Sequence, residues 1–123
     1  MELYRPLSAE EYKLVAENNF SGFPRCSDGQ PLFTLLLSQQ GAAQIARRMR
    51  IAKQAEPTVY VVSVTAEDSY IRQFPVQHKE DPDRRALWIP ADEVDILNQH
   101  LVGKIRVIES FTVNHADGDI FFV

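Results

Sequence analysis

The sequence predicts a single α+β domain with a mixed, mostly antiparallel sheet, three helices and a C-terminal β-hairpin. Stretches in which apolar residues recur three and four positions apart alternate with short runs of β-branched and aromatic residues, patterns typical of helices and strands respectively. Near the end of the chain, Lys104 to Val113 and Ile120 to Val123 flank a turn containing Asp117 and Gly118, a pair favoured in tight hairpins. No repeat or linker interrupts the 123 residues, so residues 1–123 are expected to share one core.

The first elements are predicted from local signals. Leu3 to Leu7 is expected to form a short strand. Ser8 and Glu11 form a capping box, in which the Ser8 hydroxyl accepts from the Glu11 amide and Glu11 reaches back, so a helix should run to about Asn18. The segment Asn19 to Pro31 is rich in Gly, Pro, Ser and Asp and predicts an exposed loop of a length that is often functional.

A second strand and helix follow this loop. Leu32 to Leu37 is nearly all apolar, which is typical of a strand covered on both faces. Ser38 can cap the next helix, whose apolar stripe consists of Ala42, Ile45, Ala46 and Met49. Pro57 bounds that helix, and the β-branched residues of Thr58 to Thr65 predict the next strand.

The region between this strand and the terminal hairpin has weaker patterns. Tyr70 to Val76 is a candidate strand interrupted by Pro75, and His78 to Arg85 is predicted to be a charged loop. Leu87 to Ile89 predicts a short strand. A helix is expected over Ala91 to Leu101, with inward-facing residues at Val94, Leu97 and Leu101.

Cysteine content and hydropathy indicate the compartment. Cys26 is the only cysteine and cannot form an internal disulfide, which is typical of a reducing environment. The first residues lack the basic and apolar regions of a secretory signal. No run approaches the roughly 18 apolar residues that span a bilayer. We therefore expect a cytoplasmic protein that is not inserted in a membrane.

The charge balance bears on the partner. The formal net charge of −4 disfavours nucleic acid as the main partner, because phosphate binding needs a positive field. The stretch Arg47 to Lys53 is locally basic. We interpret it as the solvated face of a helix, with a basic patch for RNA or an acidic protein as the alternative.

Two charged residues interrupt apolar rows in predicted strands. Side chains alternate along a strand, so Arg5 shares a face with Leu3 and Leu7. By the same count Glu109 lies within a row of otherwise apolar residues, namely Ile105, Val107, Phe111 and Val113. An unpaired buried charge is costly, so the two residues either pair with each other or with neighbours, or line a cleft. In the second case Arg5 would provide a cation for an anionic ligand and Glu109 a carboxylate for chemistry.

The patterns for metal and phosphate loops are absent from the sequence. Asn114, His115, Asp117 and Asp119 provide possible ligands, but the downstream Glu of an EF-hand loop is missing, and a hairpin turn explains them. The three histidines lie far apart without cysteine or carboxylate partners at zinc-ligand spacing. No glycine-rich phosphate loop is present. We therefore expect no metal.

Three segments together resemble the small ADP-ribosyltransferase fold. Leu3-Tyr4-Arg5 resembles the first core strand of that family, and Leu35 to Ser38 with the following helix resembles the strand that ends in its serine motif. The stretch Leu87 to Pro90 and the segment after it are similar to the closing part of several small members. The resemblance implies NAD as the cofactor, with Arg5 contacting its phosphates or ribose and Ser38 bracing the cleft.

The chain departs from this family at the catalytic position. The family's catalytic Glu opens the strand that here begins with Ala86, and no carboxylate stands there. The preceding loop contains Glu80, Asp81 and Asp83, while Glu109 lies on a later strand. Gln39 and Gln40 stand where the serine motif usually has a second hydroxyl.

Two functions from different classes follow. The first is a cytoplasmic ADP-ribosyltransferase-like domain that binds a nucleotide or a protein without catalysis. The alternative is an active NAD-dependent mono-ADP-ribosyltransferase, in which Arg5 and Ser38 hold the cofactor and a carboxylate such as Glu109 stabilises the transition state. The departure at Ala86 favours the first, and the sequence leaves open whether the chain is an enzyme. It predicts neither the partner nor the oligomeric state.

Overall fold

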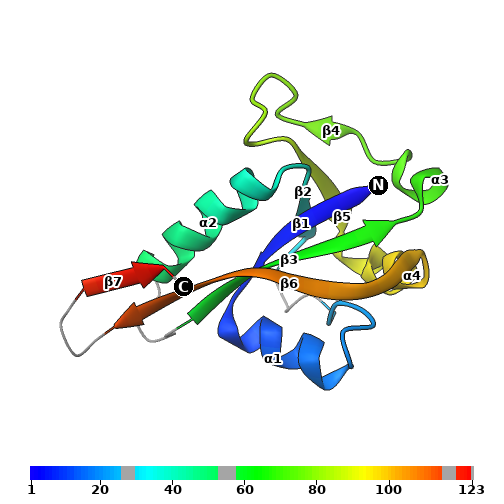
Figure 1. The fold of residues 1–123 in the computed structure, drawn as a ribbon. Coiled ribbons are helices and arrows are strands. Elements are labelled where there is room, and N and C mark those ends of the chain that lie inside the picture. Colours follow the sequence, from blue (N-terminus) through cyan, green and yellow to red (C-terminus); the bar gives the residue numbers. More distant parts are fainter. Residues whose placement is uncertain (26–29, 53–57, 115–118, 123) are drawn as a thin grey trace.

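The computed structural model describes residues 1–25, 30–52, 58–114 and 119–122, and a seven-stranded sheet forms its centre (Figure 1). The strand order is β4-β5-β2-β1-β3-β6-β7, and the six described pairings are all antiparallel. The strands are β1 (Glu2–Leu7), β2 (Leu32–Leu36), β3 (Thr58–Ala66), β4 (Val76–Gln77), β5 (Ala86–Pro90), β6 (Leu101–Asn114) and β7 (Asp119–Phe122). The helices are α1 (Ala9–Glu17), α2 (Gln39–Ala52), α3 (Asp68–Ile71), the 3₁₀ turn η1 (Ala91–Glu93) and α4 (Val94–Gln99).

The predicted α+β class and the C-terminal hairpin are confirmed, and the described residues contain four α-helices rather than three. The turn of the hairpin falls in residues 115–118, outside the described part of the chain. Cys26 also lies outside it.

Two apolar clusters cover the two faces of the sheet. The first lies under α1 and α4 and includes Leu3, Leu7, Val15, Phe33, Val62, Val64 and Leu97. The second lies under α2 and includes Leu36, Ala42, Ala43, Ala46, Val59, Val61 and Phe111. Adjacent residues of β3 thus belong to different clusters, as strand alternation requires. Each fully buried aliphatic side chain contributes about 1.5–3 kcal/mol, so the two clusters together hold these three helices on the sheet.

Strand β1 lies between β2 and β3 but pairs with them to very different extents. It pairs with β3 along its whole length, from Glu2 opposite Thr65 to Leu7 opposite Tyr60. With β2 the described pairing is at one position, Tyr4 opposite Leu36. The second half of β1 therefore separates from β2, and this opening positions the candidate site.

The helix-capping signals are confirmed, with one difference. The Ser8 hydroxyl accepts a hydrogen bond from the Glu11 amide at 3.2 Å, and the Ser38 hydroxyl accepts from the Gly41 amide at 2.9 Å. The Glu11 carboxylate does not reach back to the helix end as a capping box would require. It pairs with Arg5 instead, because a guanidinium offers two charge-assisted hydrogen bonds where the backbone offers one.

The predicted strand over Tyr70 to Val76 is wrong. Residues 68–71 form the short helix α3, and only Val76 and Gln77 pair with β5. Tyr70 and Ile71 are adjacent in sequence and both buried, which a helical turn permits and a strand with one buried face does not. The helical turn also lets the Tyr70 hydroxyl donate to the Glu93 carboxylate at 2.9 Å.

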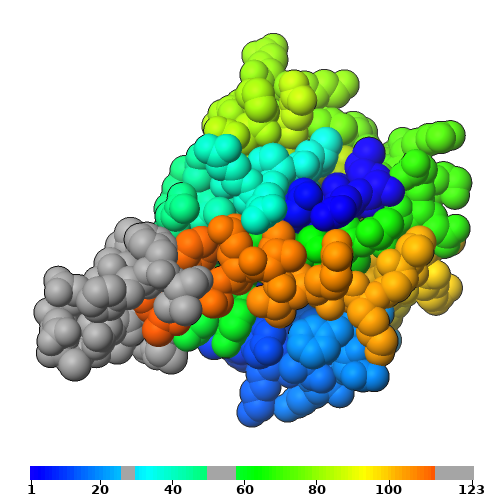
Figure 2. Space-filling view, viewed as in Figure 1, coloured from blue at the N-terminus to red at the C-terminus, as the bar shows by residue number. Residues whose placement is uncertain are grey.

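The helix predicted over Ala91 to Leu101 begins as a 3₁₀ turn and ends earlier, at Gln99. Leu101 and Val102 already belong to β6, opposite Ala66 and Thr65. Strand β6 is therefore longer than predicted. Figure 2 shows it crossing the visible face of the molecule as a band between α2 and α1.

The single apolar row predicted from Ile105 to Val113 is also wrong. The register between β3 and β6 shifts twice, between Val61 and Val62 and between Ser63 and Thr65. Gly103, at φ 77°, takes the left-handed conformation beside the second shift. Ile105 consequently packs in the first cluster and Phe111 in the second. Strand β6 is an inner strand where β7 pairs with it, from Phe111 to Asn114.

Candidate functional site

Arg5 occupies the opening between β1 and β2. Its Nη1 donates to the backbone carbonyl of Thr34 at 2.8 Å, and so bridges the two strands where their own pairing ends. Its Nε and Nη2 donate to the two carboxylate oxygens of Glu11 at 2.7 and 2.9 Å. Its guanidinium carbon lies 4.0 Å from the centre of the Phe33 ring. Arg5 is thereby held in one orientation by a strand, a helix and an aromatic face.

The Arg5 guanidinium retains capacity to bind a further group. A guanidinium carries five N–H donors, and the bonds to Glu11 and Thr34 use one each on Nε, Nη1 and Nη2. Among the described residues, no further acceptor is bound. The side chain is 17% exposed, so it lies at the floor of an opening rather than in the core.

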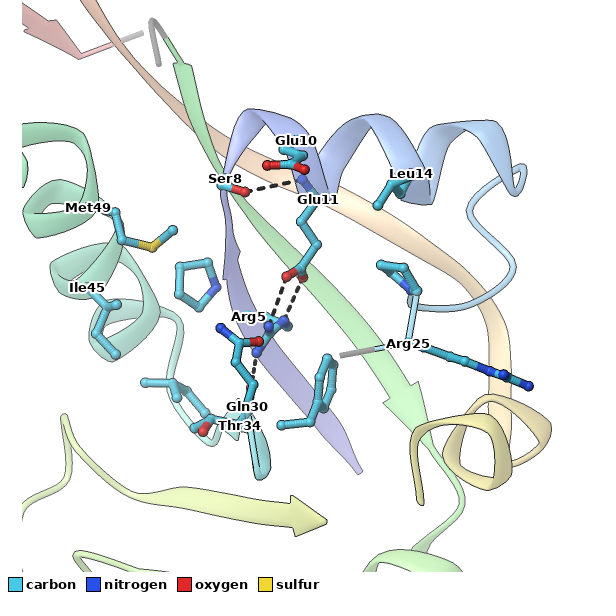
Figure 3. Close-up of a pocket in the computed structure, with 14 residues that line it drawn as sticks. Arg5, Ser8, Glu10, Glu11, Leu14, Arg25, Gln30, Thr34, Ile45 and Met49 are labelled. Carbon is cyan, nitrogen blue, oxygen red and sulfur yellow. Dashed lines mark hydrogen bonds and ion pairs between the residues drawn. The ribbon is translucent and has the colours of Figure 1, made fainter. Parts of the chain in front are cut away.

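A cavity of about 440 Å³ opens above this guanidinium (Figure 3). We call it the Arg5 cavity. Its polar lining includes Arg5, Ser8, Glu10, Glu11, Arg25, Gln30 and Thr34. Leu14 of α1 and Ile45 and Met49 of α2 provide apolar walls, as Figure 3 shows from the two helices that flank β1. This volume lies in the range of about 300–1,000 Å³ typical of small-molecule sites.

A second cavity of about 190 Å³ adjoins the first. We call it the Trp88 cavity. It lies between α2, β5 and the loop from His78 to Arg85, and it shares Thr34, Leu36 and Ile45 with the Arg5 cavity. Its other lining residues are Gly41, Gln44, Arg48, His78, Asp83, Arg84, Ala86 and Trp88. Because Thr34, Leu36 and Ile45 line both, the two cavities lie next to each other at β2, and we refer to them together as the β2 groove.

The sequence-predicted site residues do not all reach this groove. Arg5 lines the Arg5 cavity. The Ser38 hydroxyl accepts from the Gly41 amide at the start of α2, and Ser38 lines neither cavity. Ala86, at the position where the family resemblance expects a carboxylate, is buried and lines the Trp88 cavity. Of the three loop acids, Asp83 alone contributes to the lining.

The expectation that Arg5 and Glu109 face a common cleft is wrong. Arg5 stands opposite Val62 and Glu109 opposite Val61, and these neighbours in β3 point to opposite faces of the sheet. Arg5 therefore faces α1, and Glu109 faces α2. The bulge at Ile108, which has no partner in β3 between Glu109 and Val107, causes part of this difference.

Glu109 has an unusual environment of its own. Within the described residues, its Oε2 and the hydroxyl of Ser63 are buried atoms without a hydrogen-bond partner. Ser63 is 1% exposed and lies on the same face of the sheet. Glu109 lines neither cavity of the β2 groove, so a role for it in NAD chemistry stays a prediction.

The true partner of Arg5 was missed by the sequence reasoning. Glu11 lies six residues after Arg5, in the first turn of a capped helix. The capping-box pattern assigned its carboxylate to the backbone, although a helix that folds back over its preceding strand places that first turn beside the strand. An acidic residue in the first helical turn after an inward-facing arginine was therefore the available signal.

Tyrosines near the sheet have perturbed acidity. Burial, followed by the hydrogen bond to Glu2, raises the pKa of Tyr4, which lies on the α2 side of β1. Burial also raises the pKa of Tyr60, whose ring stacks on Tyr12 at 3.9 Å. For Tyr70, burial and then the hydrogen bond to Glu93 raise the pKa strongly.

The described residues contain neither a metal-ligand cluster nor a membrane-spanning helix. Across residues 1–25, 30–52, 58–114 and 119–122, no three His, Cys, Asp or Glu side chains gather as a metal site would require. In the same ranges no helix has the length and apolar character to cross a bilayer.

Comparisons with protein-family models, with curated proteins and with solved structures find no significant match. The resemblance to ADP-ribosyltransferases therefore stays a prediction.

Proposed function

We propose that the chain is a ligand-binding domain whose β2 groove takes a small anionic molecule without turning it over. The observation that carries this proposal is the arrangement of Arg5, which is oriented by Glu11 and Thr34 at the floor of a 440 Å³ cavity and has two N–H donors left for a ligand. A dinucleotide such as NAD is the specific candidate, because the family resemblance implies it. A protein segment bearing a carboxylate or phosphate is the other ligand with suitable chemistry.

The Arg5–Glu11 pair supports binding in two ways. Its bidentate geometry holds the guanidinium plane still, so a ligand does not bear the cost of ordering a long side chain. The pair also leaves N–H donors for a ligand, since Glu11 occupies the Nε edge alone and the two donors that remain are on Nη1 and Nη2. An anionic group on the remaining edge would form charge-assisted hydrogen bonds.

The lining argues for binding rather than catalysis. Where the resembling family has a catalytic carboxylate, Ala86 presents a methyl group to the Trp88 cavity. The active-transferase alternative needs Glu109 or a loop acid to stabilise developing charge. Glu109 lies outside the groove lining and Ser38 is engaged as a helix cap.

Isothermal titration calorimetry with NAD, ADP-ribose and pyrophosphate tests the proposal. The variant Arg5→Gln/Glu11→Gln removes the charged pair while leaving the net charge unchanged. Losing a charged hydrogen bond typically costs about 1.5–3 kcal/mol, so this variant should bind the anion about 10- to 150-fold more weakly. The matched control is Glu2→Gln/Arg106→Gln, which removes an exposed pair at 3.7 Å outside the groove, and it should bind like the wild type.

Equal affinity of the two double variants, or no binding of any of these anions, would contradict the proposal. Release of nicotinamide from NAD by the wild type, lost in Glu109→Gln, would instead establish the transferase alternative.

A further inference from the structure

The Trp88 cavity presents a large aromatic ring that the fold does not bury. Along β5, Leu87 and Ile89 point into the first apolar cluster, and Trp88 points to the other face of the sheet. The residue is 40% exposed. Tryptophan is among the most strongly buried residue types on average, so an exposed one in a cavity wall is a feature of binding surfaces. The ring of His78 meets it edge-on, at 5.9 Å between ring centres and 73° between planes, which leaves a face of the indole available for stacking.

Two arginines beside this ring give the cavity an excess of positive charge. Arg48 comes from α2 and Arg84 from the loop before β5, and both line the cavity. Neither forms an ion pair with another residue in the described part of the chain. Among the described residues, Asp83 is the one acidic residue in the lining. The chain as a whole carries a net charge of −4, so this local excess of cations is opposite in sign to the charge of the whole chain.

The wall of the cavity is held in place by close packing. A Cβ at Gly41 would fall well inside van der Waals contact with the carbonyl oxygen of Asp83, so only glycine lets the loop approach α2 this closely. The Leu37 amide donates to the Arg85 carbonyl at 3.0 Å, and the Asp83 amide donates to the Asp81 carboxylate at 3.0 Å. His78 has φ 55°, an uncommon conformation for a residue other than glycine. The site is therefore preorganised.

We propose that the Trp88 cavity binds a nucleotide, with the base stacked on Trp88 and the phosphate held by Arg48 and Arg84. An aromatic ring beside two cations matches the flat, apolar base and the charged phosphate of this ligand class. The cavity, at about 190 Å³, is smaller than a typical whole-ligand site and suits one part of a molecule. The inference rests on the proposed function in one respect: the rest of a larger nucleotide would extend past Thr34 into the Arg5 cavity.

Trp88 is the single tryptophan of the chain, so tryptophan fluorescence, excited at a wavelength that tyrosine does not absorb, reports on this cavity. Titration with AMP should quench the emission saturably, whereas ribose 5-phosphate, which lacks the base, should not.

The variant Arg48→Gln/Arg84→Gln should bind AMP at least about tenfold more weakly. The control Arg72→Gln/Arg106→Gln changes the net charge equally at exposed arginines outside the cavity lining and should leave AMP binding unchanged. By calorimetry, Trp88→Ala should lose about tenfold in AMP affinity and Trp88→Phe less.

Any of the following results would overturn the inference. The first is quenching by ribose 5-phosphate equal to that by AMP, and the second is equal AMP affinity in the two arginine double variants. The third is salt-sensitive binding of a single-stranded RNA oligonucleotide far tighter than that of AMP, which would assign this face to RNA.

In Arg5→Gln/Glu11→Gln, quenching by AMP should persist. If NAD binding depends on Arg5 but AMP does not quench the Trp88 emission, this inference alone fails. If AMP quenches the Trp88 emission but Arg5→Gln/Glu11→Gln binds NAD as the wild type does, the proposed function alone fails.

Discussion

The pairing of Arg5 with Glu11 predicts a large effect on stability and a measurable coupling. The Arg5 and Glu11 side chains are 17% and 24% exposed, and two charged hydrogen bonds join them. Breaking a fully buried pair from one side costs about 3–5 kcal/mol, whereas an exposed pair contributes about 0–1 kcal/mol. This pair has intermediate exposure, and Arg5→Gln also removes the hydrogen bond to Thr34. We therefore expect Arg5→Gln to lower the free energy of unfolding by about 2–3 kcal/mol.

A double-mutant cycle measures the coupling directly. Arg5→Gln, Glu11→Gln and the double variant are unfolded in urea, followed by far-ultraviolet circular dichroism. We expect a coupling of about 1–2 kcal/mol, because the double variant no longer leaves one charge without its partner. The cycle for Arg106 and Glu2, which are 66% and 47% exposed, serves as the control and should give about 0–0.5 kcal/mol. Additive losses for Arg5 and Glu11, or strong coupling between Arg5 and Glu109, would refute the assignment of the partner.

Three further predictions follow from the structure. Burial and the hydrogen bond to Glu93 raise the pKa of Tyr70 above its usual value of 10.0. The unfolded chain therefore loses this proton first as the pH rises. The stability that Tyr70 contributes is present below about pH 10 and declines above it. Denaturant unfolding at several alkaline pH values should therefore show a smaller decline for Tyr70→Phe than for the wild type; an equal decline would exclude this group as the cause. Gly41→Ala should destabilise by about 1–3 kcal/mol, since the loop at Asp83 must move, and a melting temperature equal to that of the wild type would contradict the close packing. If the family resemblance is correct, Ala86→Glu should produce nicotinamide from NAD where the wild type produces little, as measured by chromatography, and a variant that folds and binds NAD without turnover would count against that resemblance.

Much of the site lay beyond sequence reasoning because its contacts are not local. Arg5 was identified as an inward-facing cation from the alternation of Leu3, Arg5 and Leu7, and this required only the period of a strand. Its partner depended on how α1 folds back over β1. The strand predicted over Leu87 to Ile89 does not indicate that Trp88 is exposed, because that exposure depends on α2 and the loop at Asp83 leaving a cavity above it. Glu109 was placed by counting residues along one strand, and the register shifts between β3 and β6 invalidated that count.

The sequence by itself determined the α+β class, the central strands, the caps at Ser8 and Ser38, and the terminal hairpin. These features arise from hydrogen bonds and side-chain periods within a few residues, so they can be read from neighbouring positions. The tertiary structure alone decided the order of the strands, the opening between β1 and β2, the pairing of Arg5 with Glu11, and the exposure of Trp88 in the cavity beside α2. Each of these depends on contacts between segments distant in the chain, which neighbouring positions do not reveal. Glu109 is an example, because a bulge of one residue in β6 is enough to turn it to the other face of the sheet.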